Sequence, residues 1–168
     1  MLQGGVHRND RSPSTVFHSG EQRCLVSEVS RQGYVPDMVV ATREVLDNLQ
    51  RAVAAAVVDE IVETGGRASM VAADLSDEAQ SQALISRASN ALGPITCLIN
   101  NASVFGEDTT QTATRNSWDL HMEVNLRAPF VLTQTYARQL PPSHAGNLIN
   151  IVDQRVWNLG ADYTTYTP

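Results

Sequence analysis

The stretch ITCLIN, residues Ile95–Asn100, is an almost wholly apolar run of strand length that leads into a polar pair, Asn100 and Asn101. Gly93 and Pro94 stand just before it and end the helical pattern upstream. A short apolar run bounded by turn residues is typical of a strand that is buried on both faces. The stretch therefore predicts a strand of a parallel sheet, with polar side chains at its carboxyl end.

Two further runs of the same kind lie on either side of this strand. SMVAAD, residues Ser69–Asp74, precedes it, and GNLINIVD, residues Gly146–Asp153, follows it. The segments between and before these runs have helical spacing, over residues 42–64, 77–92 and 117–140. Helices that alternate with nearly all-apolar strands indicate an α/β protein with a doubly wound parallel sheet in three α/β/α layers. Ligands of such folds bind at the carboxyl ends of the strands.

The bulk properties fit one domain and exclude several kinds of partner. The chain has 168 residues and a net charge of -6, with no basic stripe that could bind a nucleic-acid backbone. No apolar run approaches the length of a membrane span, and no signal-peptide pattern is present. Cys24 and Cys97 show neither metal spacing nor a disulfide framework. We therefore expect a cytoplasmic protein without a metal or a membrane partner.

The first part of the chain has no clear period. We expect residues 1–41 to be irregular and residues 42–168 to form the domain. Two apolar clusters, Cys24–Val29 and Met38–Ala41, are candidate strands, but only eight residues separate them. A crossover between parallel strands needs about ten to twelve residues. The sequence therefore predicts no normal βαβ unit here, which would leave Ser69–Asp74 without a neighbouring strand.

An ordered set of short motifs resembles the short-chain dehydrogenase/reductase family. LINNAS, residues Leu98–Ser103, is similar to the family's NNAG segment, and VNL, residues Val124–Leu126, is similar to its catalytic-asparagine site. Asp153 stands at the end of a strand where most members have serine. Tyr166 follows thirteen positions later, at the family's usual offset for the catalytic tyrosine. The resemblance implies a Rossmann-type fold and a nicotinamide dinucleotide cofactor.

The same resemblance implies the residues that contact the cofactor. Asp74-Leu75 is similar to the acidic-hydrophobic pair that borders the adenine pocket. The full implied set is Asp74, Leu75, Asn100, Asn101, Ala102 and Ser103. The cofactor would be NADP, and NAD stays open because no residue that reads a 2′-phosphate is matched. Structural roles also stay open: Asp74 can cap a helix, and the two asparagines can form a turn.

Three departures from the common pattern point to one branch of the family. NNAS replaces NNAG, Phe105 follows two residues later, and Asp153 replaces serine. IVDQRVW, residues Ile151–Trp157, is similar to bacterial pteridine and dihydromonapterin reductases. The resemblance implies a small pterin-like substrate that stacks on Phe105. It also implies that Asp153 works with Tyr166.

The implied chemistry is coherent. Hydride transfer to a C=N carbon requires that the ring nitrogen gain a proton, and Tyr166 would donate it. A carboxylate at Asp153 suits the fused amide and amidine edge of a pterin, because it accepts hydrogen bonds. Asn125 would resemble the family asparagine that anchors a water and the lysine. Each of these side chains also has an ordinary structural reading, above all Phe105, since exposed aromatic residues on loops are common.

Two elements of the family pattern have no counterpart in the sequence. The glycine-rich turn that cradles the pyrophosphate is absent, and all twelve basic residues are arginine, so no lysine assists Tyr166. We therefore expect weak dinucleotide binding and doubtful activity of this chain. A short-chain reductase of another carbonyl substrate and a non-catalytic binding remnant stay open as alternatives. Family members are usually homo-oligomers. The four histidines, His121 included, form no cluster, and we expect them to be structural or on the surface.

Overall fold

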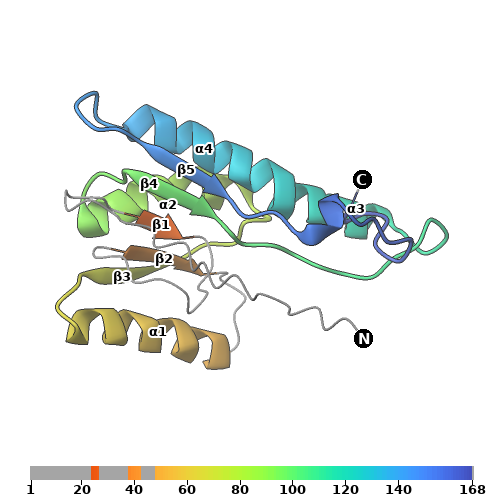
Figure 1. Ribbon diagram of the computed structural model, residues 1–168, viewed down its shortest axis with the longest axis horizontal. Coiled ribbons are helices and arrows are strands. Elements are labelled where there is room, and N and C mark those ends of the chain that lie inside the picture. The colour runs from red at the N-terminus through yellow and green to blue at the C-terminus, as the bar shows by residue number, and fades with distance from the viewer. Residues whose placement is uncertain (1–23, 27–37, 43–47, 168) are drawn as a thin grey trace, which may run out of the picture.

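The computed structural model describes residues 24–26, 38–42 and 48–167, and its centre is a parallel sheet (Figure 1). The strands are β1 (Cys24–Val26), β2 (Met38–Thr42), β3 (Ala68–Ala72), β4 (Cys97–Asn100) and β5 (Asn147–Asn150). They pair in the order β3-β2-β1-β4-β5, and every pairing is parallel. The chain moves outward from β1 to β3 and then returns to add β4 and β5 on the other side. This confirms the doubly wound α/β fold.

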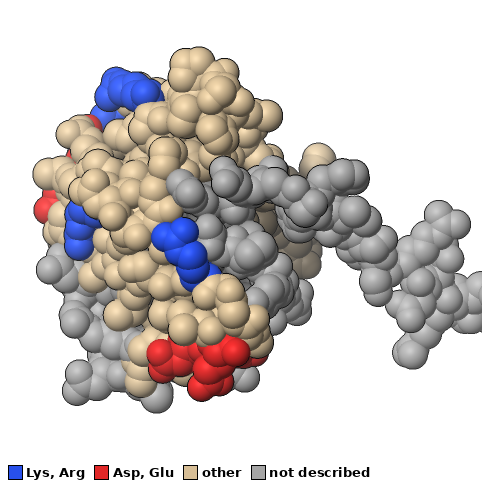
Figure 2. Space-filling view, turned by 90° about the vertical axis from the view of Figure 1, so that its left-hand side faces the viewer, with Lys and Arg blue, Asp and Glu red and all other residues tan. Residues whose placement is uncertain are grey.

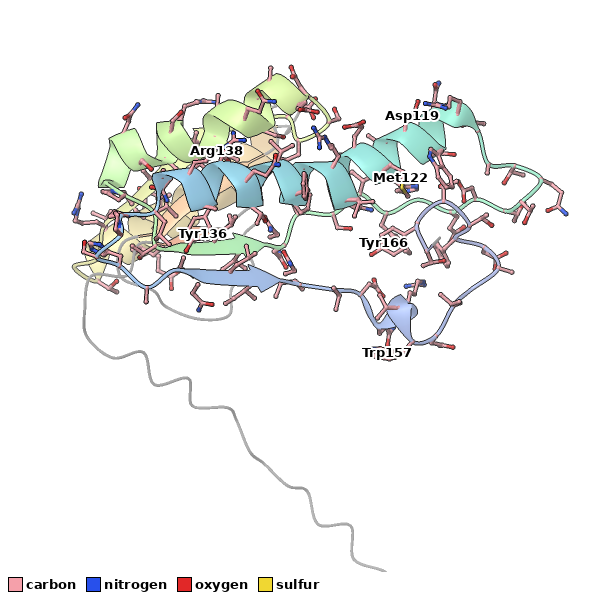
Figure 3. The ribbon with its side chains drawn as sticks, turned by 90° about the horizontal axis from the view of Figure 1, so that it is seen from above. Asp119, Met122, Tyr136, Arg138, Trp157 and Tyr166 are labelled. Atoms are coloured by element: carbon pink, nitrogen blue, oxygen red, sulfur yellow. The ribbon has the colours of Figure 1, made fainter. Side chains whose placement is uncertain are left out.

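Helices cover the sheet. They are α1 (Asn48–Glu63), α2 (Glu78–Leu92), α3 (Arg115–Met122) and α4 (Ala128–Gln139). Helices α2 and α4 lie side by side (Figure 3), and α1 and α2 both contact β2 and β3. The crossovers into β3 and into β4 run in opposite directions across the sheet. Right-handed connections therefore place α1 on the face opposite α2 and α4, which gives the three layers.

The main core lies between the sheet and the α2–α4 layer. Leu84, Ala88 and Leu92 are buried on one side of α2, because they recur at helical spacing. They belong to a cluster that also contains Val71, Ala73, Ile85, Ile95, Leu98, Leu132 and Tyr136. The Tyr136 hydroxyl donates a hydrogen bond of 2.8 Å to the Thr96 carbonyl oxygen, so the polar end of this buried ring is satisfied. This core supports the strand that leads into the site.

The expectation that the sheet lacks its two central strands is wrong. Residues 24–26 and 38–42 form β1 and β2, and β2 pairs with β3 along all five residues. Strand β1 ends at Val26 rather than Val29, so eleven residues rather than eight separate it from β2. That length reaches the lower limit of a crossover connection. The rest of residues 1–41, where we expect irregular chain, lies outside the described residues.

The helix expected over residues 117–140 begins two residues earlier than expected, and its regular hydrogen bonding is interrupted. It runs from Arg115 to Gln139, with a π-helical turn over Glu123–Arg127 between α3 and α4. Pro129 has no N–H, so it cannot donate to the carbonyl of Asn125, and the regular ladder is broken there. The Ala128 N–H instead bonds to the Glu123 carbonyl, five residues back.

Candidate active site

A cleft of about 420 Å³ opens beyond the carboxyl ends of β4 and β5. The segments that follow these two strands lie at the same end of the molecule, on the right in Figure 1. They supply the residues that line the cleft, which are Asn101, Ser103, Phe105, Ile151, Val152, Asp153, Arg155 and Tyr166. Five of these, Asn101, Ser103, Phe105, Asp153 and Tyr166, are residues that the sequence nominates. The parallel sheet brings them together because carboxyl ends of parallel strands share one edge.

Asp153 and Tyr166 form the central polar pair of the cleft. The Tyr166 hydroxyl donates a hydrogen bond to Asp153 Oδ2 at 3.2 Å. Asp153 begins a 3-10 turn over Gln154–Val156, and its Oδ1 accepts from the Arg155 N–H at 2.8 Å. The turn therefore orients the carboxylate toward the tyrosine. A phenol beside a carboxylate acceptor is an arrangement that can give and take a proton.

Arg155 is a cleft residue that the sequence does not single out. Its guanidinium Nη1 lies 3.8 Å from Asp153 Oδ1. Its Cζ also lies 4.1 Å from the ring centre of Tyr163 and 4.9 Å from that of Phe105. A cation at these distances from aromatic rings is attracted to them. Arg155 therefore places a positive charge next to both the Asp153 carboxylate and the rings of Phe105 and Tyr163, which we call the aromatic wall. No spacing rule would have predicted this.

Phe105 belongs to a group of three rings. It stacks on Tyr163 with ring centres 4.7 Å apart, and it meets Tyr166 edge-on at 4.9 Å. Its side chain is still 50% exposed, so part of the ring surface faces the cleft. The stacking on Tyr163 fixes the plane of the Phe105 ring. A flat ligand would therefore meet a wall that is already ordered.

Asn125 does not line the cleft but shapes the loop that does. Its Oδ1 accepts from the Val104 N–H at 2.8 Å, and its Nδ2 donates to the Val104 carbonyl at 2.9 Å. Both ends of the side-chain amide are thus paired with one backbone residue. The π-helical turn carries Asn125, and π-helical turns are frequent at functional sites. Asn125 is therefore in a position to set the backbone between Ser103 and Phe105.

Asn100 is the last residue of β4, and the next residues lead toward the cleft. Asn100 is buried, and its Nδ2 donates to Asn150 Oδ1 at 2.8 Å. Its own Oδ1 is buried and has no hydrogen-bond partner among the described residues. Asn101 and Ser103 reach the cleft, whereas Ala102, half-buried, does not line it. A buried carbonyl oxygen without a donor is unusual, and it fits a place where a ligand supplies one.

Asp74 and Leu75 are not brought into this cleft. They follow β3, and three strands separate β3 from β5 in the sheet. Asp74 Oδ1 accepts from the N–H and the hydroxyl of Ser76, at 2.9 and 2.7 Å, and Leu75 packs against the core. The N-cap of α2 is Asp77 rather than Asp74. The two residues remain at the carboxyl edge of the sheet. A ligand that extends along this edge from the cleft could reach them with its other end.

A buried polar cluster behind the aromatic wall was not predicted. It contains Asp108, His121 and Thr165, and we call it the Asp108 cluster. Hydrogen bonds from the Thr165 hydroxyl and amide lower the pKa of Asp108, and a bond from Ser117 and the nearby His121 act in the same direction. His121 was expected to be structural or on the surface, and it is buried. No spacing connects these residues, since Thr165 lies 57 positions after Asp108.

Other classes of site are not indicated in the described part of the chain. None of the helices there is long and apolar enough to cross a membrane. The same residues contain no group of three or more metal-ligating side chains. The face shown in Figure 2 carries separate arginine side chains and a group of acidic ones, without a continuous basic surface.

Comparison with known proteins identifies relatives of this arrangement. A family model described as short chain dehydrogenase matches residues 38–167. The crystal structure of FolM alternative dihydrofolate reductase 1 from Brucella suis in complex with NADP is 30% identical with a TM-score of 0.76, covering 87% of this chain and 63% of that one. A blue fluorescent protein from a metagenomic library, in complex with NADPH, is 28% identical with a TM-score of 0.75, covering 87% and 62%.

Curated relatives are similar over a shorter stretch. The 2-dehydro-3-deoxy-D-gluconate 5-dehydrogenase of Dickeya dadantii is 29% identical over 111 residues, which cover 66% of this chain and 44% of that protein. The inactive 2-(S)-hydroxypropyl-CoM dehydrogenase 2 of Xanthobacter autotrophicus is 33% identical over 88 residues, covering 52% and 38%. The chain thus spans less than half the length of these two relatives.

Proposed function

Because this chain belongs to the short-chain dehydrogenase family, we propose that its cleft serves the NADP-dependent reduction of a pteridine-type C=N bond. The observation that carries the proposal is the hydrogen bond of 3.2 Å between Tyr166 and Asp153, beside the partly exposed ring of Phe105. A donor, an acceptor and a flat apolar wall are what a polar heteroaromatic ring requires. The likeness to an alternative dihydrofolate reductase at 30% identity supports the same substrate class.

The described residues fit the cofactor at the cleft end. Asn100 Oδ1 is a buried acceptor without a donor, and Asn101 and Ser103 line the cleft beside it. Asp74 and Leu75 would hold the adenine end at the edge of β3. When bound in its reduced form, NADPH would supply the hydride. Two neighbours at 28–30% identity are complexes with NADP or NADPH, which supports NADP over NAD.

The residues of the chain manage the proton. Tyr166 Oη carries a hydrogen that points to Asp153 Oδ2 and would turn to the substrate nitrogen. Asp153 would then accept a hydrogen bond from the substrate edge, and Arg155 would balance its charge. Asn125 would keep the Val104 backbone in place, so that Phe105 meets the ring. Ile151 and Val152 also line the cleft and would give a bound ring apolar surface to cover.

A carbonyl substrate is the second candidate. The similarity to a 2-dehydro-3-deoxy-D-gluconate 5-dehydrogenase favours it, because that name describes a keto acid substrate. Arg155 would then pair with the acid group. A non-catalytic role is the third candidate, because one relative is named as inactive.

Two further statements belong to the proposal. We place the protein in the cytoplasm, because its two cysteines, Cys24 and Cys97, show no disulfide framework in the sequence, as is usual in a reducing compartment. We also propose self-association, as is usual in the family. Exposed Leu126 and Phe130 support an apolar contact beside α4.

A binding experiment tests the substrate class without requiring turnover. We expect 7,8-dihydropterin, added with oxidised NADP, to shift the ring resonances of Tyr166 and Phe105 in NMR spectra of the full chain. Phe105→Ala should weaken this binding about two- to tenfold, by the loss of a stacking energy of roughly 0.5–1.5 kcal/mol. Gluconate-type keto acids are the matched ligands for the alternative. Shifts with the keto acid alone would reject the pterin proposal, and shifts with neither would support a non-catalytic chain.

A further inference from the structure

The Asp108 cluster joins three separate parts of the chain behind Tyr166. Asp108 belongs to the loop after β4, His121 to α3, and Thr165 to the final segment. Asp108, His121 and Thr165 are only 7%, 3% and 1% exposed, respectively. Thr165 directly precedes Tyr166 in the sequence. A buried polar cluster beside the proposed proton donor invites the question of what it does for that donor.

The first connection is through the backbone. The Asp108 N–H donates to the Asp162 carbonyl at 2.9 Å, and the Thr164 N–H donates to the Asp108 carbonyl at 3.1 Å. These bonds form an isolated parallel bridge between Asp108 and Tyr163. The loop after β4 is therefore tied to the final segment at one residue, Asp108.

The second connection is through the Asp108 side chain. Its Oδ1 accepts from the Thr165 N–H at 2.9 Å, and its Oδ2 accepts from the Thr165 hydroxyl. An ionised carboxylate only accepts, so the single hydroxyl proton of Thr165 points to Asp108. The contact of 2.7 Å between Thr165 Oγ1 and His121 Nδ1 must then be donated by the imidazole. The three groups form one directed chain, from His121 through Thr165 to Asp108.

The third connection leads to the tyrosine. The Tyr166 ring meets His121 edge-on at 5.8 Å and Phe105 at 4.9 Å. Its hydroxyl reaches Asp153, but its Cα is placed by the peptide that it shares with Thr165. Both polar groups of Thr165 are bound to one ionised carboxylate, and such bonds are roughly twice as strong as neutral ones.

We propose that Asp108 is a positioning residue, which acts through Thr165 to hold Tyr166 within hydrogen-bond distance of Asp153. The catalytic purpose of this positioning rests on the proposed function of Tyr166. The hydrogen bonds that hold Tyr166 in place do not depend on that function. Asp108 touches no reacting atom. Instead, it fixes the position of the proton donor, Tyr166, through its two hydrogen bonds with Thr165.

The test compares two substitutions at Thr165 in the full chain without any ligand. Thr165→Val keeps the shape and removes the hydroxyl, whereas Thr165→Ser keeps the hydroxyl. In chain labelled with ¹³C-tyrosine, we measure the nuclear Overhauser contact between the Tyr166 and Phe105 rings. Tyr136 serves as the monitor of the fold, because this residue of α4 is buried in the core and lies away from Tyr166 (Figure 3).

We expect the ring contact to be lost in Thr165→Val and retained in Thr165→Ser, with unchanged Tyr136 resonances in both. Asp108→Asn should also lose it, because the amide has only one acceptor oxygen, whereas the N–H and the hydroxyl of Thr165 donate to two separate oxygens of the carboxylate. A contact that survives in Thr165→Val overturns the proposal. Changes at Tyr136 also overturn it, because the hydroxyl would then support the fold rather than the tyrosine. Since no ligand is added, these outcomes are independent of the substrate class.

Discussion

At the scale of single residues, the site combines partners that sequence spacing reveals with partners that it cannot reveal. The thirteen-residue offset from Asp153 to Tyr166 nominates both, and the structure places them within one hydrogen bond. Arg155 lies inside the motif IVDQRVW, yet its contacts depend on rings that come from two other segments. Contacts between segments leave no periodic signal, so only the fold shows them.

Turnover is the first prediction at this scale. The chain has no lysine beside Tyr166, and acid–base assistance contributes about 10²–10⁴-fold to a rate. We therefore expect the 168-residue chain to oxidise NADPH with 7,8-dihydropterin at a rate at or below detection, followed by absorbance. Tyr163→Phe is the matched control, because it keeps the ring and removes a neighbouring hydroxyl that donates to Glu107. Brisk turnover that Tyr166→Phe abolishes and Tyr163→Phe leaves intact would show that the chain needs no lysine.

The second prediction concerns acid. Hydrogen bonds from Thr165 hold the pKa of Asp108 below its ordinary value of about 3.9. A depressed folded-state pKa stabilises the protein above the unfolded pKa, and this stabilisation is lost as the pH falls through the folded one. We expect the free energy of unfolding to fall below about pH 4 and to fall less in Asp108→Asn.

Chemical denaturation at several pH values measures this slope. Hydrogen bonds from Gln80 and Arg127 also lower the pKa values of Asp77 and Glu78, so these two residues add to the same loss of stability in acid. The slope of the variant is therefore compared with the slope of the parent. Identical slopes in Asp108→Asn and in the parent would mean that Asp108 is protonated alike in the folded and unfolded chain.

At the scale of elements, the break in the long helix has a local cause. Pro129 removes one backbone donor, and the π-helical turn before it presents Asn125 to the Val104 backbone. The helical pattern of the sequence shows where the apolar face lies but not that one turn is wider. A proline at the second position of a helix is also compatible with the start of a separate helix. The sequence alone therefore does not distinguish a wider turn within one helix from two successive helices.

The third prediction tests this element. Asn125→Ala removes both hydrogen bonds to Val104, so we expect a loss of about 1–3 kcal/mol in stability and faster amide exchange at Val104. Urea unfolding and hydrogen exchange by NMR are the measurements. Asn116→Ala, at an exposed position of α3, is the control and should change stability by less than about 0.5 kcal/mol. Equal effects of the two substitutions would contradict the assigned role.

The first two strands show a different limit of sequence reasoning. Cys24–Val29 and Met38–Ala41 are candidate strands in the sequence, but the eight residues between them argue against a βαβ unit, whereas eleven residues separate the observed strands. Their identity depends on pairing with β3 and β4, which lie far along the chain. The three longer apolar runs were recognised because each is bounded by turn residues. The end of β4 at Asn100 agrees with the expectation, and the other observed ends differ from the expected ones by one to three residues.

At the scale of the whole molecule, apolar side chains are exposed beyond β5. They are Ile151, Val152, Val156, Trp157 and Leu159, and Trp157 is the most exposed at 91%. Patches of this kind favour association. The fourth prediction is that Trp157→Ser reduces light scattering of concentrated chain but leaves the thermal midpoint unchanged, because the side chain buries little surface. Trp118→Ser, on α3, is the comparison and should lower the midpoint, because that ring is more than half-buried. A lower midpoint in Trp157→Ser would show that the ring packs in solution.

The order of the strands has a consequence for how the chain acquires its shape during synthesis. Strand β1 lies at the centre of the sheet, yet one of its neighbours, β4, begins 73 residues later. Until Cys97–Asn100 has left the ribosome, one edge of β1 has no partner and can bind other chains. The cleft is completed still later, since its tyrosine is at position 166. Pairings so distant in sequence close slowly, so the nascent chain passes through a long interval with an open sheet and no site.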